Sequence, residues 1–281
     1  MITRSSNSRS MDDLYSPLSS RRVLIPAVST SFYLRSPDRK QLTVMDKIVF
    51  FSFKTPCILY WVGGLAFLVS SILFYPFFNA PQDPEGMGDA IGSRGFVLGS
   101  LTFLVGSCIE VYHAVPGRAM SSHGLLQWAP ILSSMMNTVG SAQFVVGSLY
   151  FMPVHYDAHP SLGCSLFISG CLCFCLSILT DFTRFSTSEL SAAFQWGDLV
   201  SVWFLAAVVN FAGNLLFISG CYFYLPQFLQ VGDPAIAAMN LTFATNQFVV
   251  GSLCFALAPL LQIYNINHDI NRKSICCRAI K

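Results

Sequence analysis

A pattern of glycine, phenylalanine and serine recurs in six apolar segments of this chain. In the clearest copy, Phe144 follows a glycine by four residues and precedes Gly147, Ser148, Phe151 and a proline at offsets of three, four, seven and nine. The other copies centre on Phe67, Phe103, Phe167, Phe217 and Phe248. Only alternate copies end in the proline (Pro76, Pro153 and Pro226), so the pattern predicts a repeating unit of two segments.

The offsets of the pattern lie within an arc of roughly 100° on one helix face. Helices in lipid associate mainly through van der Waals contact, which small residues permit by letting backbones approach closely. We therefore interpret the recurrent glycines as helix-packing residues. An alternative is that the Gly-Ser pairs line a pore or hold a ligand. The glycines concerned are Gly63, Gly99, Gly106, Gly140, Gly147, Gly163, Gly170, Gly213, Gly220 and Gly251.

The apolar segments are long enough to cross a membrane. Hydrophobic residues make up 53% of the 281 positions and charged residues 11%, which is far from the composition of a soluble domain. The intervals 55–82, 158–180, 199–232 and 235–268 contain no Asp, Glu, Lys or Arg. Since a span needs roughly 20 apolar residues, we predict an all-α polytopic membrane protein with six transmembrane helices.

The six spans group into three tandem helical hairpins, at about 56–115, 125–182 and 199–264. They form a predicted transmembrane domain over residues 55–266. Residues 1–54, rich in Ser, Arg and Lys, read as a disordered basic cytoplasmic tail, with an organellar targeting sequence as the alternative. Residues 267–281 form a short basic tail. An even number of crossings per unit relates the copies by an axis along the membrane normal, which predicts a six-helix bundle with rough threefold character.

Loop charges set the expected orientation. With six spans, every lysine and arginine except Arg94 falls on the side that holds both termini. By the positive-inside rule this side is cytoplasmic. The three recurrent prolines then stand at the outer ends of the outward-running helices, where each acts as a helix stop.

The segments Asn210–Gly220 and Asn246–Pro259 share an aromatic-x-x-Gly core, which continues as Ser252 in the second. This pairing resembles the YrhK-like family of small membrane domains with two spans. The resemblance implies three divergent copies fused over about Pro56 to Ile266. It implies an integral membrane protein and no established chemistry.

Three polar residues are candidates for a cavity inside the bundle. Glu110 takes the +7 position that is Phe or Tyr in the other five copies, and ionisable residues within spans usually face the protein interior or a water-filled cavity. A location at the interface, solvated or paired with Arg118, is the alternative. Asn137 and Asn210 both lie at −7, where they form either interhelical hydrogen bonds or a polar ligand site.

Eight of the ten cysteines lie within or beside spans, so we expect no disulfide framework. Cys276 and Cys277, beside basic residues, are candidates for S-palmitoylation. His155 and His159, which flank Asp157, could form at most a weak metal site, and we predict none. We find no catalytic motif, cofactor motif or nucleic-acid-binding pattern, and therefore predict neither an enzyme nor a cofactor.

Two functions remain. The first is a non-enzymatic multipass protein that acts through packing, oligomerisation or recruitment of a partner. Its expected partners are the lipid bilayer, a second copy in a homo-oligomer and a cytoplasmic partner of the N-terminal tail. The alternative is a transporter of a small solute or ion, with Glu110, Asn137 and Asn210 lining a polar cavity at the hairpin axis. Convergence of these three residues on one cavity would favour transport.

Overall fold

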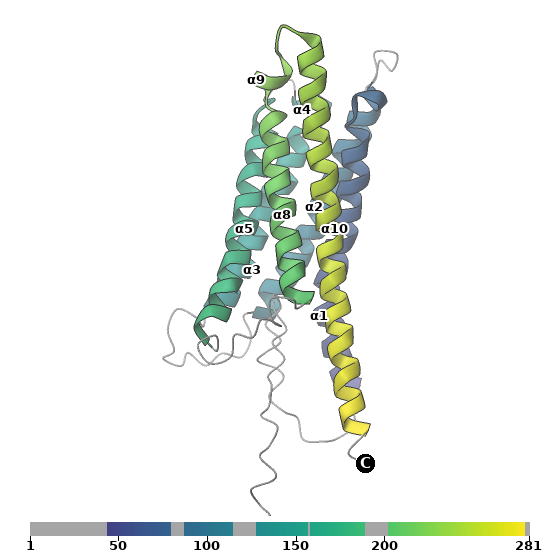
Figure 1. The fold of residues 1–281 in the computed structure, drawn as a ribbon, viewed down its shortest axis with the longest axis vertical. Coiled ribbons are helices and arrows are strands. Elements are labelled where there is room, and N and C mark those ends of the chain that lie inside the picture. The colour runs from purple at the N-terminus through teal and green to yellow at the C-terminus, as the bar shows by residue number, and fades with distance from the viewer. Residues whose placement is uncertain (1–43, 80–86, 115–127, 157, 189–201, 279–281) are drawn as a thin grey trace, which may run out of the picture.

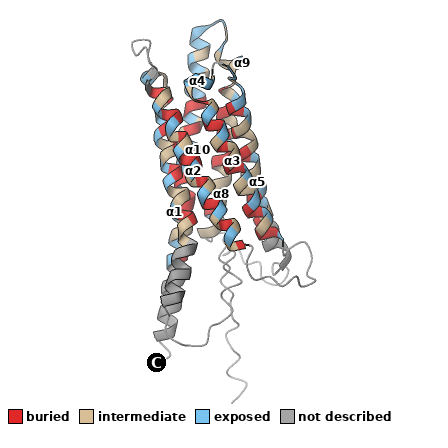
Figure 2. Ribbon diagram, turned by 180° about the vertical axis from the view of Figure 1, so that it is seen from behind, coloured by how far each residue is buried: buried red, intermediate tan, exposed pale blue. Residues whose placement is uncertain are grey.

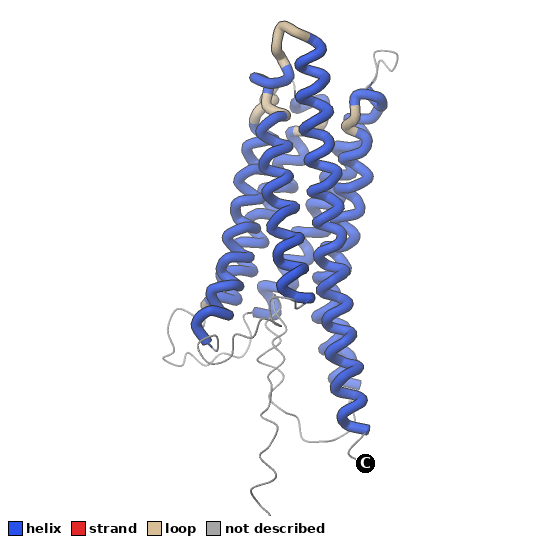
Figure 3. The backbone as a smooth tube through the Cα atoms, in the orientation of Figure 1, coloured by secondary structure: helices blue, strands red, loops and turns tan. Residues whose placement is uncertain are grey.

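A computed structural model of the chain describes residues 44–79, 87–114, 128–156, 158–188 and 202–278. Side chains are described within 54–78, 88–114, 128–156, 158–182 and 202–267. All regular secondary structure in these residues is helical, so the predicted all-α fold is confirmed (Figure 3).

The described residues form long helices that run side by side (Figure 1). These helices are α1 (Val44–Leu73), α2 (Met87–Ala114), α3 (Ala129–Tyr150), α5 (Leu162–Ser188), α8 (Val202–Phe223) and α10 (Pro234–Arg278). One-turn helices follow three of them: η3 (Pro76–Asn79), α4 (Pro153–Tyr156) and α9 (Pro226–Leu229).

Five of the long helices are long and apolar enough to cross a membrane, which indicates a membrane protein. The segments that qualify are Lys54–Leu73, Gly88–Ala114, Leu162–Phe182, Val202–Phe223 and Pro234–Asn267. Helix α3 is not among them, because its serines together with Asn137 and Gln143 lower its mean hydropathy. The predicted count of six spans therefore depends on α3.

The recurrent prolines follow the ends of α1, α3 and α8 at the same distance. Each of these helices ends six residues after its central phenylalanine, at Leu73, Tyr150 and Phe223. The proline at +9 then begins the one-turn helix, a position that suits proline because the first turn of a helix has no partner for its N–H groups. Proline thus separates each long helix from the loop that follows it.

Two helices extend into segments that the sequence analysis assigned to tails. Helix α1 begins at Val44, before the predicted boundary at residue 55, and passes through Pro56 without ending. Helix α10 continues to Arg278, through most of the predicted tail 267–281. Neither glycine nor proline occurs after Pro259 to stop α10.

The long helices form a closed circle. Their neighbours in space follow the order α1, α2, α3, α5, α8 and α10, and α10 packs against α1 again. The hairpins α1/α2, α3/α5 and α8/α10 therefore each contact the two others. Buried residues line the inner faces, whereas exposed residues, many of them Leu and Val, lie on the outside (Figure 2).

Two layers of aromatic side chains fill the axis of this circle. The central residues of the first helix of each hairpin, Phe67, Phe144 and Phe217, have ring centroids 5.7, 5.7 and 6.3 Å apart. One layer further along the axis, the ring centroid of Phe74 lies 6.2 Å from that of Phe151 and 6.0 Å from that of Tyr224, and the last two lie 5.6 Å apart. Equivalent positions of the three hairpins thus meet in threes, as the pattern predicts for an axis along the bundle.

The recurrent glycines face the partner helix of the same hairpin. A Cβ atom on Gly147 would lie 2.6 Å from the ring of Phe167, and one on Gly170 would lie 2.6 Å from the ring of Phe144. At all ten recurrent glycines, an added Cβ atom would lie within 3.2 Å of an atom of the partner helix. The phenylalanine of one helix therefore lies in the space that the glycine of the other leaves open.

Small polar residues join neighbouring hairpins. The hydroxyl groups of Ser100 on α2 and Ser148 on α3 lie 2.9 Å apart. Those of Ser71 on α1 and Ser252 on α10 lie 3.0 Å apart, which closes the circle. The +4 serines of α1, α3 and α10 thus provide hydrogen bonds between hairpins, while the glycines provide close contact within them.

Candidate functional site

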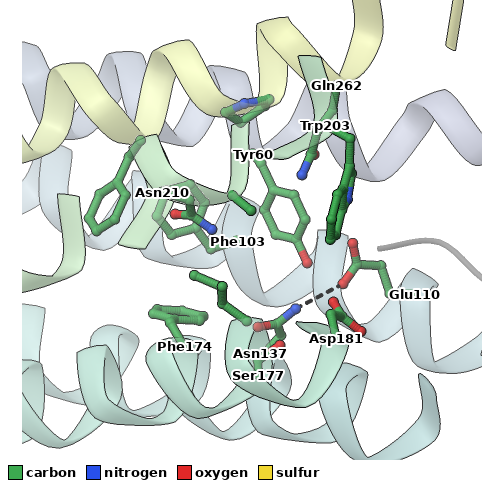
Figure 4. A pocket seen from close by; sticks show the side chains of 14 residues that line it. Tyr60, Phe103, Glu110, Asn137, Phe174, Ser177, Asp181, Trp203, Asn210 and Gln262 are labelled. Atoms are coloured by element: carbon green, nitrogen blue, oxygen red, sulfur yellow. Dashed lines mark hydrogen bonds between the residues drawn. The ribbon is translucent and has the colours of Figure 1, made fainter. Parts of the chain in front are cut away.

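A pocket lies beside the Phe67 layer, toward the start of α1 and the end of α10. Figure 4 shows the side chains that line it. Its volume is about 90 Å³, enough for several water molecules. All of the long helices contribute to its wall. The lining residues are Tyr60, Phe103, Glu110, Asn137, Phe174, Ser177, Ile178, Asp181, Trp203, Ala207, Asn210, Phe255, Pro259 and Gln262.

The pocket follows from the repeated pattern. Tyr60, Asn137 and Asn210 lie seven residues before the central phenylalanines of α1, α3 and α8. Positions seven residues apart share a helix face, so these side chains form the next layer along the axis. Small and polar residues occupy this layer in α3 and α8, where other layers contain aromatic rings. The space that the smaller side chains leave is the pocket.

Glu110 lies at the wall of this pocket and not in solvent. It is only 6% exposed, and its Oε2 accepts a hydrogen bond of 3.2 Å from Nδ2 of Asn137. The bond joins α2 to α3, which belong to neighbouring hairpins. The predicted alternative partner, Arg118, lies outside the described residues. Because Glu110 replaces an aromatic residue of the pattern, it places a carboxyl group where the other copies place a ring.

Tyr60 points its hydroxyl group toward the carboxyl group of Glu110 (Figure 4). Its ring packs edge-on against Phe103 at a centroid distance of 5.8 Å and lies against Gly106. The hydroxyl oxygen is buried and, within the described part of the chain, makes no hydrogen bond of standard geometry. The hydroxyl group nevertheless interacts with the carboxyl group of Glu110, so the two side chains form one polar cluster at the pocket wall.

Asp181 adds a second carboxyl group to the pocket. It lies on α5, is 8% exposed, and faces the same cavity as Glu110 and Asn137 (Figure 4). The sequence analysis did not identify it. Asp181 lies fourteen residues after Phe167 and seven after Phe174, on the same face of the helix, so extending the pattern by another seven residues would have found it.

Asn210 completes the set of predicted polar residues. It lies on α8 and lines the pocket with Trp203 and Ala207 of the same helix. Gln262 of α10 contributes a further side-chain amide to the pocket wall (Figure 4). The structure thus brings Glu110, Asn137 and Asn210 together in one pocket, although they belong to three different helices.

Other candidates lie apart from this pocket. The side chains of Cys276 and Cys277 and the residues 1–43 lie outside the described residues, as does Asp157. The rings of His155 and His159 lie 6.3 and 6.0 Å from that of Tyr150. Among the described residues, no three His, Cys, Asp or Glu side chains gather as a metal site would require.

Comparisons with known proteins identify the first two hairpins. A family model described as YrhK-like protein matches residues 48–115 and 129–184, which correspond to α1/α2 and α3/α5. No curated protein and no solved structure matches the chain. The resemblance to this family is therefore confirmed for the first two hairpins, whereas the segments of the third hairpin that suggested it lie outside the matched residues. Each of these two hairpins is thus similar to the YrhK-like family.

Proposed function

We propose that this chain is a multipass membrane protein that binds a small polar solute in its internal pocket and transports it. Six helices cross the bilayer as three like-oriented hairpins, and both termini lie on the cytoplasmic side. The third hairpin, α8/α10, is a further divergent copy of the YrhK-like unit. Solute enters the pocket from the side of the termini.

The contacts of α3 support its role as a sixth span. Helix α3 packs between α2 and α5, so it belongs to the same circle as the five more apolar helices. Its polar residues Ser133, Ser134 and Ser148 are buried, whereas Leu132 and Val139 are exposed on the outside. The side that would meet lipid is therefore apolar, and the residues that lower the mean hydropathy of α3 face the protein.

The convergence of Glu110, Asn137 and Asn210 on one pocket carries the functional proposal. A protein that acts only through packing would bury these side chains against neighbouring helices with no cavity between them. Here they face a space that can hold several water molecules. This arrangement favours the transport hypothesis over the packing hypothesis.

The aromatic layers fill the axis of the bundle on one side of the pocket. The rings of Phe67, Phe144 and Phe217 meet on the axis, and a second aromatic layer follows them. A solute in the pocket has no polar path through these rings. In this proposal the bundle is closed on the side of these rings, and transport requires the rings to separate.

Access to the pocket can be tested with cysteine variants of two adjacent alanines. Ala207 lines the pocket, whereas Ala206 is fully buried and does not line it. In sealed vesicles of known orientation, a membrane-impermeant charged thiol reagent should modify Ala207→Cys from the side of the termini. Ala206→Cys should remain at the background set by the native cysteines. Equal, background-level reaction of both variants from either side would show that solutes do not reach the pocket, and the packing hypothesis would replace this one.

A further inference from the structure

The charge of the pocket wall indicates the charge of its ligand. Glu110 and Asp181, from α2 and α5, are both more than nine-tenths buried and face the same cavity. None of the described lining residues is a lysine or an arginine. Two carboxyl groups that face one cavity attract a positively charged ligand and repel an anion.

The aromatic residues of the wall indicate what kind of cation fits. Tyr60, Phe103, Phe174, Trp203 and Phe255 surround the cavity from five different helices. Ca²⁺ and Mg²⁺ sites are built mainly from carboxylate oxygens, whereas among the described residues no three His, Cys, Asp or Glu side chains gather at this cavity. A cation that lies against the face of an aromatic ring is attracted by the ring quadrupole, and quaternary ammonium groups are bound by aromatic cages in this way.

The remaining polar groups can orient such a ligand. The hydroxyl group of Tyr60 is buried and points toward the carboxyl group of Glu110, with which it interacts (Figure 4). A donor group of the ligand beside this pair would meet two oxygen atoms. The cavity of about 90 Å³ admits only a few non-hydrogen atoms beyond this group. Together these features describe a site for a small amine.

We propose that the pocket binds a small organic cation, an ammonium group with a few carbon atoms, between the carboxyl groups of Glu110 and Asp181 and the surrounding aromatic rings. This inference rests on the proposed function, because it names the class of solute that the same pocket accepts.

Equilibrium binding to the full chain in lipid nanodiscs tests the proposal. The probes are radiolabelled methylammonium and tetramethylammonium, with sodium, acetamide and acetate as unlabelled competitors. Saturable binding of at least one ammonium probe is expected, and none of the three competitors should displace it at equal concentration. Glu110→Gln and Asp181→Asn should each weaken binding roughly tenfold or more, in the range expected for a desolvated charge contact.

The matched control is Asp233→Asn, which removes one carboxylate far from the pocket. Asp233 caps the start of α10 by accepting a hydrogen bond from the N–H of Ala235, and asparagine can accept the same bond. This variant should bind the probes as the unchanged chain does. Trp203→Leu tests the aromatic part separately, because it should weaken tetramethylammonium binding while leaving both carboxyl groups in place.

The outcomes separate this inference from the proposed function. If sodium or acetamide displaces the probe, and Glu110→Gln abolishes this displacement, the assignment of an organic cation is overturned. The pocket would still be a solute-binding site. Absence of saturable binding, together with unreactive Ala207→Cys, would overturn both. Absence of saturable binding with reactive Ala207→Cys, or binding that Glu110→Gln, Asp181→Asn and Asp233→Asn all leave unchanged, would overturn the organic-cation site alone.

Discussion

Replacing Gly170 by alanine tests the packing within a hairpin. The added Cβ would lie 2.6 Å from Cδ1 of Phe144 and 3.0 Å from the carbonyl oxygen of Gly140. Ordinary contacts begin at 3.4 Å, so the ring would have to move by about 0.8 Å. It cannot move easily, because its centroid lies 4.5 Å from that of Phe167 and 5.7 Å from that of Phe67.

Two effects of opposite sign compete in this variant. Alanine is better than glycine within a helix by about 1 kcal/mol, whereas overpacking a tight core costs about 1 to 3 kcal/mol. Since a buried ring and a backbone oxygen both block the new atom, we expect a cost near the upper end of that range. The net loss of stability is then about 2 kcal/mol, which corresponds to a decrease in Tm of roughly 4 to 8 °C for a chain of this size.

A thiol-reactive fluorophore measures this decrease in detergent, because Cys164 and Cys171 are buried and react only on unfolding. Gly232→Ala is the matched control, since a Cβ there meets nothing within 4 Å and the Tm should barely change. In the double variant with Phe144→Leu, the smaller side chain should relieve part of the clash, so the two losses should add to less than their sum. Equal Tm values for Gly170→Ala and Gly232→Ala, or strictly additive losses, would refute the reasoning.

Three further predictions concern the axis and the pocket. Ser148→Ala should reduce the free energy of unfolding by about 0.6 to 2 kcal/mol. Ser100→Ala should cost less in its presence than alone, because the two hydroxyl groups bond each other while Ser100 keeps its bond to the carbonyl oxygen of Phe96. A double-mutant cycle measures this coupling, and strictly additive losses would contradict it. Glu110→Phe restores the residue type of the other copies, and its ring should fill the pocket. Ala207→Cys should then no longer react with the charged thiol reagent. Unchanged labelling would contradict the assigned position of Glu110. Phe67→Ala removes the buried ring that meets both other hairpins and should cost about 3 to 5 kcal/mol, measured as a decrease in Tm; a change near zero would show that the aromatic layer does not hold the hairpins together.

The inner faces of the helices could be predicted because a single physical requirement sets them. Close approach of two helices in lipid needs small residues at a fixed spacing, and the positions of Gly147, Gly170 and Gly251 express that requirement directly. Glu110 was identifiable for a related reason. It departs from a position that is otherwise aromatic, and a departure from a repeat can be read in one sequence.

The rest of the pocket could not be predicted in the same way. Tyr60 and Trp203 have the residue types of ordinary packing residues, and only the arrangement of the hairpins around the axis places them beside Glu110. Asp181 lies beyond the last position of the recurrent pattern, so only an extension of that pattern by seven residues past Phe174 reaches it. The contact between α1 and α10 joins the two ends of the chain, so no local pattern reveals it. Both helices also extend beyond their apolar segments, where composition no longer distinguishes helix from tail.

Closure of the circle by α1 and α10 makes each hairpin a neighbour of both of the others. A polypeptide with only one hairpin could bury the same surfaces by assembling as a trimer, but each substitution would then appear three times around the axis. Covalent linkage removes that constraint. Glu110 can differ from Phe174 and Phe255, its counterparts in the other two hairpins, so the fused chain can place one acidic group to one side of an otherwise symmetric aromatic interior.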